Sequence, residues 1–275
     1  MTAPLPPVTD TPPKSDLLPR VIVGVLLIAL ALGEVWLGGW SFAAFAGLGG
    51  LLIFAEWAVM HRIGRSWRFA GLIAVGLAVV ATQAGHEEIA SAGLVIVATL
   101  LGLLWRLGGL RGARWMSTGL LYAGLPVVAL LWLRLEFGFD LVIWLLALVW
   151  ATDIFAYFAG RAIGGPKIAP KISPKKTWAG LGGGMIGAAI TSAALMPMTL
   201  NAPIDDRLLF AAIGAGLAVV AQAGDFFESW LKRRVGVKDS GTLLPGHGGI
   251  MDRVDGLVPV AVLVALILDV ADWLQ

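Results

Sequence analysis

The chain has 275 residues, of which 58% are hydrophobic and only 14% are charged, and its mean hydropathy is +0.86. Soluble domains carry about 25% charged residues, so this composition excludes an ordinary soluble domain and indicates a bilayer protein. The net charge of +2 gives no indication of a nucleic-acid-binding protein, and the lack of cysteine excludes disulfides and thiolate metal sites.

The first twenty residues contain six of the fourteen prolines, mixed with polar residues. Such a segment cannot bury apolar surface, so we expect residues 1–20 to be a disordered tail. No clear cleavage site follows the first apolar run, so we do not expect a cleaved signal peptide. A signal anchor over 21–38 would give the same structure, because that segment would remain as a membrane span.

Apolar segments long enough to cross a bilayer recur along the rest of the chain. A transmembrane helix needs about 20 apolar residues. The sequence therefore predicts an all-α, polytopic membrane protein with N-terminal spans over 21–133 and a C-terminal region over 139–275. The first two spans form a tight hairpin around Gly38 and Gly39, or else are misdivided. The nine predicted spans are 21–38, 41–60, 68–84, 89–105, 115–133, 139–160, 178–197, 207–224 and 256–273.

The distribution of Lys and Arg predicts the orientation. Basic residues gather in the connections after the second, fourth, sixth and eighth spans, and the alternate connections are acidic or neutral. Cytoplasmic loops of membrane proteins carry the excess of Lys and Arg. We therefore expect a bacterial inner-membrane protein with a cytoplasmic N-terminus, cytoplasmic loops at 161–177 and 225–255, and Gln275 outside.

Glycine is concentrated in the seventh predicted span, which indicates close packing of small residues between helices. This composition permits a homodimer without requiring one. The glycines concerned are Gly180, Gly183, Gly184 and Gly187.

A first polar cluster continues the eighth span. Asp225, Glu228, Ser229 and Lys232 have offsets of 0, 3, 4 and 7, so they share one helical face. A solvated charge ladder is the alternative, and it suits the basic run from Lys232 better than Asp225, which lies where the apolar run stops. Ionisable residues at span ends indicate function.

A glycine-rich loop, 235–249, and two acids follow this helix. Consecutive glycines let backbone N–H groups turn toward an anion, whereas a lone histidine such as His247 is more often structural. Asp252 and Asp255 are three residues apart and carry the oxygen ligands that Mg²⁺ prefers. They could instead complement the positive N-terminus of a helix. We expect Asp225 to approach them from the neighbouring helix.

Two further groups precede the eighth span. Ser173 and Pro174 force a turn that presents Lys175, Lys176 and Thr177, although attraction to anionic lipid would also explain the cations. On the sixth span, one helical face carries an acid within the apolar region, and a structural Asp–Arg pair and a substrate contact stay equal alternatives there. That face carries Asp153, Tyr157 and Arg161.

The run from Ser229 to Asp255, SWLKRRVGVKDSGTLLPGHGGIMDRVD, resembles the signature of phosphatidate cytidylyltransferases, also called CDP-diacylglycerol synthases. The segments SPKKTW and DxxAYxxGR are also similar, so the specific resemblance covers about 150–260. Ala179 departs from it, since many members have Glu there. The restricted positions that match are Ser229, Lys232, Arg233, Lys238, Asp239, His247, Gly248, Gly249, Asp252, Arg253 and Asp255.

The resemblance implies that CTP and phosphatidic acid react at the bilayer surface to give CDP-diacylglycerol and pyrophosphate. It implies Mg²⁺ held by Asp225, Asp252 and Asp255, with Lys232 and His247 completing the catalytic set; a second, monovalent cation is left open. It leaves Asp153, Tyr157, Arg161, Glu228 and Asp239 without an assigned role. The expected phosphate-binding residues are Ser173, Lys175, Lys176, Thr177, Ser229, Arg233, Lys238, Gly248, Gly249 and Arg253.

Two other functions compete with this one. A CTP-dependent lipid kinase would transfer the γ-phosphoryl group to a lipid hydroxyl, which would need activation by a base. A transporter or channel would use Asp153 and Asp225 along an ion pathway, although the chain shows no internal repeat of the inverted kind.

Overall fold

The computed structural model describes residues 17–109, 112–199, 203–241, 243 and 248–273. The expected disordered tail lies outside the described residues as far as residue 16, and residues 17–20 begin the first helix. The elements are α1 (Leu17–Leu37), α2 (Gly39–Met60), α3 (Arg65–Gln83), α4 (Glu87–Gly108), α5 (Ala113–Glu136), α6 (Gly138–Ala162), β1 (Lys167–Ala169), β2 (Ser173–Thr177), α7 (Trp178–Thr199), η1 (Ile204–Asp206), α8 (Arg207–Val235), α9 (Met251–Val254) and α10 (Leu257–Trp273).

Each predicted span coincides with a helix to within a few residues at its start, which confirms a helical, multi-pass membrane protein. In the part of the chain that the structure describes, seven helices, α2 to α8, are long and apolar enough to cross a membrane. The apolar parts of α1 and α10, Ile22–Leu37 and Leu257–Ala271, are shorter. The eighth helix continues beyond the predicted span to Val235, as its polar face indicated.

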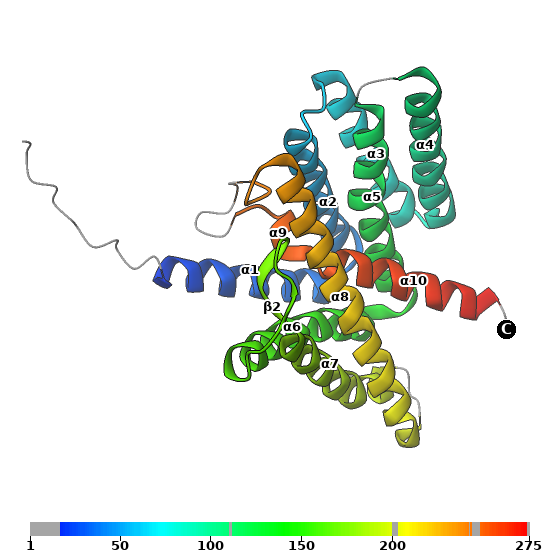
Figure 1. Ribbon diagram of the computed structural model, residues 1–275. Helices are drawn as coiled ribbons and strands as arrows, with labels where there is room; N and C mark the ends of the chain where they lie inside the picture. The colour runs from blue at the N-terminus through cyan, green and yellow to red at the C-terminus, as the bar shows by residue number, and fades with distance from the viewer. Residues whose placement is uncertain (1–16, 110–111, 200–202, 242, 244–247, 274–275) are drawn as a thin grey trace, which may run out of the picture.

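The helices form two groups that α8 and α10 connect (Figure 1). Helices α2, α3, α4 and α5 pack on one another, and α6 and α7 pack together with α8 against α7. The C-terminal part of α8 reaches the first group, because Leu231 is buried in the same cluster as Trp57 of α2 and Met251 of α9. The loop that follows α8 therefore lies against the first group, whereas the segment that follows α6 contacts α7 and α8.

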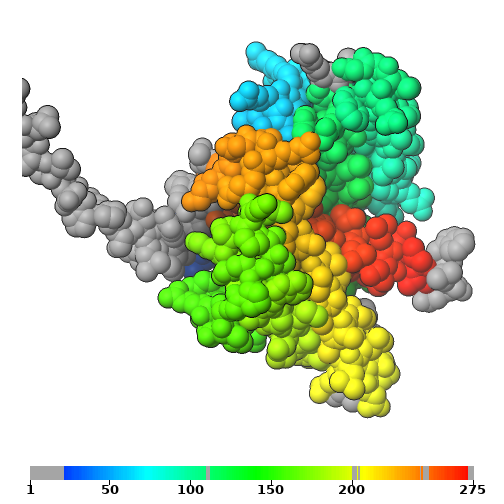
Figure 2. Space-filling model, viewed as in Figure 1, coloured from blue at the N-terminus to red at the C-terminus, as the bar shows by residue number. Residues whose placement is uncertain are grey.

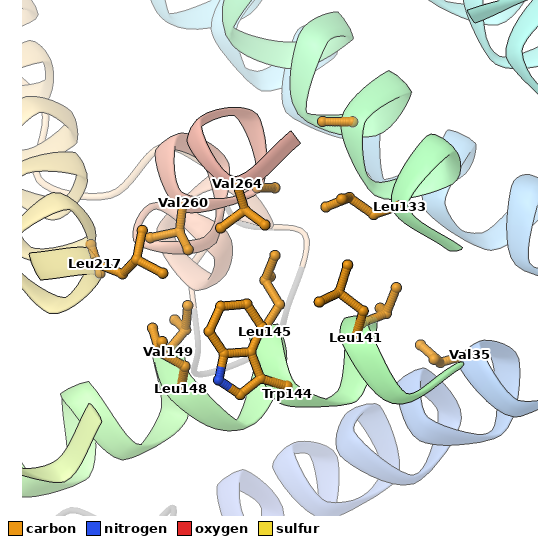
Figure 3. Packing of buried hydrophobic residues seen from close by; sticks show 14 of the residues in the cluster. Val35, Leu133, Leu141, Trp144, Leu145, Leu148, Val149, Leu217, Val260 and Val264 are labelled. Atoms are coloured by element: carbon orange, nitrogen blue, oxygen red, sulfur yellow. The ribbon is translucent and has the colours of Figure 1, made fainter. Parts of the chain in front are cut away.

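The larger core surrounds α6 (Figure 3). Trp144, Leu145 and Leu148 of this helix are almost fully buried, and they pack toward Val260 and Val264 of α10. The indole Nε1 of Trp144 donates to Ser192 Oγ of α7 at 3.1 Å, so its one polar atom is satisfied inside the core. This packing fixes α10 across the second group.

The turn between α1 and α2 is the expected tight hairpin. Gly38 and Gly39 both have positive φ angles, 64° and 54°, which favour glycine. Arg134 Nε of α5 donates to Val35 O at 2.8 Å, so a side chain from another helix satisfies a carbonyl at the end of α1. A Cβ atom on Gly38 would lie 2.5 Å from Arg134 Nη2, so the arginine also needs glycine there.

One short β-hairpin interrupts the otherwise helical fold, which is the expected all-α class. Strands β1 and β2 pair antiparallel, with Lys167 opposite Thr177 and Ala169 opposite Ser173. The sequence predicted only a turn and a basic loop, because strands this short carry no readable alternation of apolar and polar residues. The hairpin matters because β2 contacts both α7 and α8.

The glycines of α7 pack against α6, which confirms the predicted small-residue interface. A Cβ atom on Gly183 would lie 2.3 Å from Ala159 Cβ and 2.8 Å from Phe155 O. A Cβ atom on Gly187 would lie 2.6 Å from the Phe155 ring. Gly183 and Gly187 therefore make their close contacts with a helix of the same chain.

We predict that Gly183→Ala lowers the melting temperature of the detergent-purified protein, whereas Gly182→Ala leaves it unchanged or raises it. Both substitutions gain roughly 1 kcal/mol of helix propensity. Only Gly183 meets neighbouring atoms, since a Cβ atom on Gly182 has none within 4 Å. Overpacking costs about 1–3 kcal/mol and should exceed the gain. Equal melting temperatures for the two variants would contradict the packing described here.

Candidate active site

A polar cavity of about 650 Å³ lies between α6, the hairpin, α7 and α8. Figure 2 shows the hairpin region, in light green, below the end of α8, in orange. Four cations and two carboxylates line the cavity. The excess of positive charge suits an anionic ligand, and the carboxylates lie beside it. Its charged residues are Asp153, Arg161, Lys167, Lys175, Lys176 and Asp225.

Lys176 joins the hairpin to α8. Its ammonium group forms an ion pair with Asp225 and lies 4.7 Å from the centre of the Phe226 ring. Strand β2 points alternate side chains to opposite faces, so Lys175 next to it is exposed while Lys176 is half-buried. Lys176 therefore brings the basic hairpin into contact with Asp225.

The sixth helix presents Tyr157 and Arg161 to the same cavity. Arg161 Nη1 donates to the hydroxyl of Tyr157 at 2.9 Å, and no ion pair joins Arg161 to Asp153 in the structure. The structural Asp–Arg pair is therefore not formed. Since all three side chains line the cavity, the arrangement favours a substrate contact.

Thr177 has a local role at the start of α7. Its Oγ1 accepts a hydrogen bond from Gly180 N at 3.0 Å, and the residue is buried. This is the geometry of a residue that caps a helix N-terminus. Thr177 thus supports the cavity wall, and Ser173 lies at the far end of the same strand.

Three carboxylates act on one another near the middle of the site. Burial, followed by the negative charge of Asp225, raises the pKa of the Asp255 carboxyl to about 7. The charge of Asp153 adds to this rise, and the Gly256 N–H group, 2.9 Å from Asp255 Oδ1, opposes it. Lys176 lowers the pKa of Asp255 in turn, but less than burial and Asp225 raise it.

Gly224 allows α8 to approach the chain that carries Asp255. A Cβ atom at this position would lie only 2.4 Å from the carbonyl oxygen of Asp255 and 2.7 Å from Pro259 Cγ. The expected approach of Asp225 and Asp255 from neighbouring segments therefore depends on a residue without a side chain.

Asp252 has a different environment from the expected metal ligand. Its Oδ1 accepts from Lys232 Nζ at 2.6 Å, and its Oδ2 accepts from Ser240 N, Ser240 Oγ and Gly249 N at 2.8–2.9 Å. Burial would raise the pKa of Asp252, but hydrogen bonds with Glu228, Lys232 and the two N–H groups outweigh it and lower the pKa below its usual range. Both oxygens are thus occupied within the protein.

Lys232 lies between two acids. Its Nζ is 2.5 Å from Glu228 Oε2 and 2.6 Å from Asp252 Oδ1. The pair Glu228 and Lys232 confirms that these positions share a helical face, as their spacing of four predicted. In this arrangement Lys232 neutralises buried carboxylates and fixes the loop after α8.

Glu56 of α2 organises the same loop, and the sequence analysis missed it. Its two carboxylate oxygens accept from Ile250 N and Met251 N, each at 2.9 Å, and from Ser240 Oγ at 3.0 Å. Glu56 therefore serves the first N–H groups of α9 from another helix, as a capping residue would. Its signal was available, since it is the one acid inside the second predicted span.

The glycines of this loop fit around the two carboxylates. Gly248 has a φ of +84°, and a Cβ atom on it would lie 2.7 Å from Asp252 Oδ2. A Cβ atom on Gly249 would lie 2.1 Å from Ser240 Oγ and 2.5 Å from Glu56 Oε2. The sequence predicted that the Gly249 N–H group would face a phosphate. It donates a hydrogen bond to Asp252 Oδ2 instead.

The remaining predicted residues lie around the cavity and the loop that follows α8. Ser229 Oγ is 3.4 Å from Asp225 Oδ1, and Arg233 Nη1 donates to Val237 O at 3.2 Å. Lys238, Asp239 and Arg253 are exposed. His247 lies outside the described residues.

No group of three acidic or histidine side chains is placed to hold a metal ion among the described residues. The expected trio of Asp225, Asp252 and Asp255 is divided, because Asp252 faces Lys232 and the loop. Asp153 is the acid that accompanies the other two.

We predict that Glu56→Gln loosens the loop while the helices persist. An amide NH₂ group would face one of the N–H donors, which removes a charged hydrogen bond worth about 1.5–3 kcal/mol. Hydrogen exchange of residues 248–251 should become roughly ten- to hundredfold faster. The matched control is Glu34→Gln, because the Glu34 carboxylate accepts from Ser41 Oγ at an exposed position far from this loop. Unchanged exchange in the Glu56 variant would contradict this role.

Comparison with known proteins identifies the family of the chain. A model of the family described as "Cytidylyltransferase family" matches residues 18–271. The chain is 41% identical over 261 residues to a phosphatidate cytidylyltransferase of Brucella melitensis, covering 92% of this chain and 93% of the relative. It is 35% identical to one of Pseudomonas aeruginosa, covering 92% and 97%. The chain therefore belongs to the cytidylyltransferase family.

Proposed function

We propose that this protein is a CTP:phosphatidate cytidylyltransferase, which makes CDP-diacylglycerol and pyrophosphate for phospholipid synthesis. The observation that carries the proposal is the cavity in which the cations of the hairpin and α6 face Asp225 at the end of a membrane-spanning helix. The family and the names of the relatives support the same reaction.

The reaction joins two anions. A phosphatidate oxygen attacks the α-phosphorus of CTP, and the bond to the β-phosphate breaks as pyrophosphate leaves with its electron pair. A phosphate monoester has a second pKa near 6 and is largely a dianion at pH 7, so the nucleophile needs no strong base. The protein must instead position the reactants and neutralise charge.

The residues of the cavity divide this work. Lys175 is exposed and can meet the polyphosphate first, whereas Lys176 would be shared between Asp225 and an incoming phosphate. Arg161, held by the hydroxyl of Tyr157, provides planar donors for a second phosphate oxygen. These cations reduce the repulsion that opposes the approach of the two substrates.

Mg²⁺ fits the acids at the inner end of the cavity. It typically uses one or two carboxylates together with substrate phosphates, and Asp225 and Asp255 provide two. Burial, and after it the charge of Asp225, raises the pKa of Asp255, and a divalent ion would favour its ionised form. When bound, Mg²⁺ would polarise phosphate oxygens and favour the departure of pyrophosphate. In this proposal Asp252 holds the loop, in place of its expected role as a ligand.

We also propose nine crossings in a bacterial inner membrane, with the N-terminus and the cavity on the cytoplasmic side. The alternation of basic and acidic connections supports this orientation. The apolar parts of α1 and α10 are shorter than a usual span, so the bilayer would thin around them or flanking residues would reach to the headgroups. A homodimer stays a prediction, and the α7 glycines that permitted it pack on α6.

We predict that cytidine label from CTP enters phosphatidate in vesicles, and that label on the γ-phosphate leaves as pyrophosphate. Nucleotidyl transfer retains the α-phosphate on the lipid, whereas a lipid kinase would transfer the γ-phosphate. Thin-layer separation of the lipid from both labelled reactions measures the difference. Lipid that carries only γ-label would overturn the proposed function in favour of the kinase.

We predict that Asp225→Asn and Asp255→Asn each reduce turnover by about 100-fold or more, because each removes charge where the phosphates react. The parent should lose activity in a chelator and regain it with Mg²⁺. Asp205→Asn is the control, since Asp205 is exposed in η1. Melting temperatures of the variants separate lost chemistry from lost folding. Near-parental turnover in both site variants would contradict the assignment.

A further inference from the structure

A second groove, of about 430 Å³, lies between α5, α8 and α10. Helix α10 contacts both α5 and α8, and in Figure 1 it emerges from behind α8. Its lining is apolar apart from the hydroxyl of one tyrosine, so it suits a hydrocarbon chain. The lining residues are Tyr122, Val219, Val220, Ala223, Gly224, Phe227, Val258 and Pro259.

The groove begins beside the carboxylates and extends into the spanning part of α8. Gly224 lines it and directly precedes Asp225, and the Asp255 carbonyl packs against Gly224. From Phe227 to Val219 the helix rises roughly 12 Å, in the direction away from its polar end. A chain attached to a headgroup at Asp225 and Asp255 would therefore lie along the groove.

Tyr122 supplies the one polar atom that borders the groove. Its hydroxyl is buried and has no hydrogen-bond partner in the described part of the chain. The ring is fixed by Trp57, at a centroid distance of 5.2 Å, and by Phe227, at 5.9 Å. Phe227, which packs on this ring, is three residues from Gly224 on α8, so Tyr122 borders the end of the groove near the carboxylates. A buried donor without an acceptor indicates a ligand that brings one.

We propose that the groove holds one acyl chain of the lipid substrate, and that the Tyr122 hydroxyl donates to the ester carbonyl that joins this chain to glycerol. This inference rests on the proposed function. The occupant follows from three observations: the lining is hydrocarbon-like, the groove lies along spanning helices, and its polar end adjoins the carboxylates.

The groove would act by orientation more than by affinity. Lipid tails are as apolar as the side chains that line it, so a chain gains little transfer free energy on leaving the bilayer. A fixed chain and a fixed carbonyl instead hold the phosphate of the same lipid at a constant angle to its target. The expected effects are therefore on kcat/KM for the lipid and not on KM for CTP.

The first test fills the groove. Ala223 is exposed and lines it, so we expect Ala223→Phe to lower kcat/KM for long-chain phosphatidate by about tenfold or more with KM for CTP unchanged. Ala212→Phe is the matched control, because Ala212 is also exposed and lies eleven residues earlier on nearly the same side of α8. Equal kinetics in the two variants would show that only bulk bilayer lipid borders this surface and would overturn the proposal.

The second test isolates the hydroxyl. We expect Tyr122→Phe to lower kcat/KM for diester phosphatidate by about tenfold, the size of one hydrogen bond. With a dialkyl ether analogue, which lacks the carbonyl, parent and variant should react equally. The same ester-to-ether ratio in both proteins would overturn the contact. Failure of the parent to transfer cytidine label to any phosphatidate would instead overturn the proposed function, so the two failures are distinguishable.

Discussion

Two internal carboxylates, Glu56 and Asp252, hold together the part of the molecule on which the site depends. Between them they accept hydrogen bonds from the N–H groups of Ser240, Gly249, Ile250 and Met251. Ser240, Gly249 and Met251 are buried, and their N–H groups must be satisfied because unpaired N–H groups in such surroundings are costly. Glu56 comes from α2, so the loop that begins α10 is attached to the N-terminal helices.

The acids of the site therefore fall into two groups with different electrostatics. Asp252 and Glu228 share Lys232, and the hydrogen bonds of Asp252 hold its pKa low. Asp225 and Asp255 are compensated only in part, by Lys176, and the pKa of Asp255 is raised. Both oxygens of Asp252 have partners within the protein, and a fully paired carboxylate stabilises a fixed geometry. Glu228 shares Lys232 with it, although Glu228 Oε1 is buried without a partner among the described residues. We therefore assign a structural role to Asp252, and chemistry to Asp225 and Asp255, which line or adjoin the cavity and are compensated only in part.

The sequence predicted the features that depend on local spacing. Apolar length located the helices, and offsets of three and four placed Glu228 and Lys232 on one face. It did not predict the partners of Glu56, which lie 184–195 residues away, because periodicity contains no information on contacts between distant segments. For the same reason it grouped Asp252 with Asp255, although the two acids face different turns of α8. The β-hairpin was missed because its pairing covers too few residues to leave a pattern.

The polar cavity and the apolar groove, which the proposed reaction uses together, are both lined by the same part of α8. Gln222 and Asp225 line the polar cavity, whereas Ala223, Gly224 and Phe227 line the apolar groove. Residues three or four apart share a helical face, so each set forms its own stripe, and at about 100° per residue the two stripes lie on opposite sides of α8. A water-soluble nucleotide and a membrane lipid can then approach the same carboxylates from opposite sides of a single helix. The rotation of α8 about its own axis determines which residues face the cavity and which face the groove. The close packing at Gly224 and the burial of Leu231 fix that rotation.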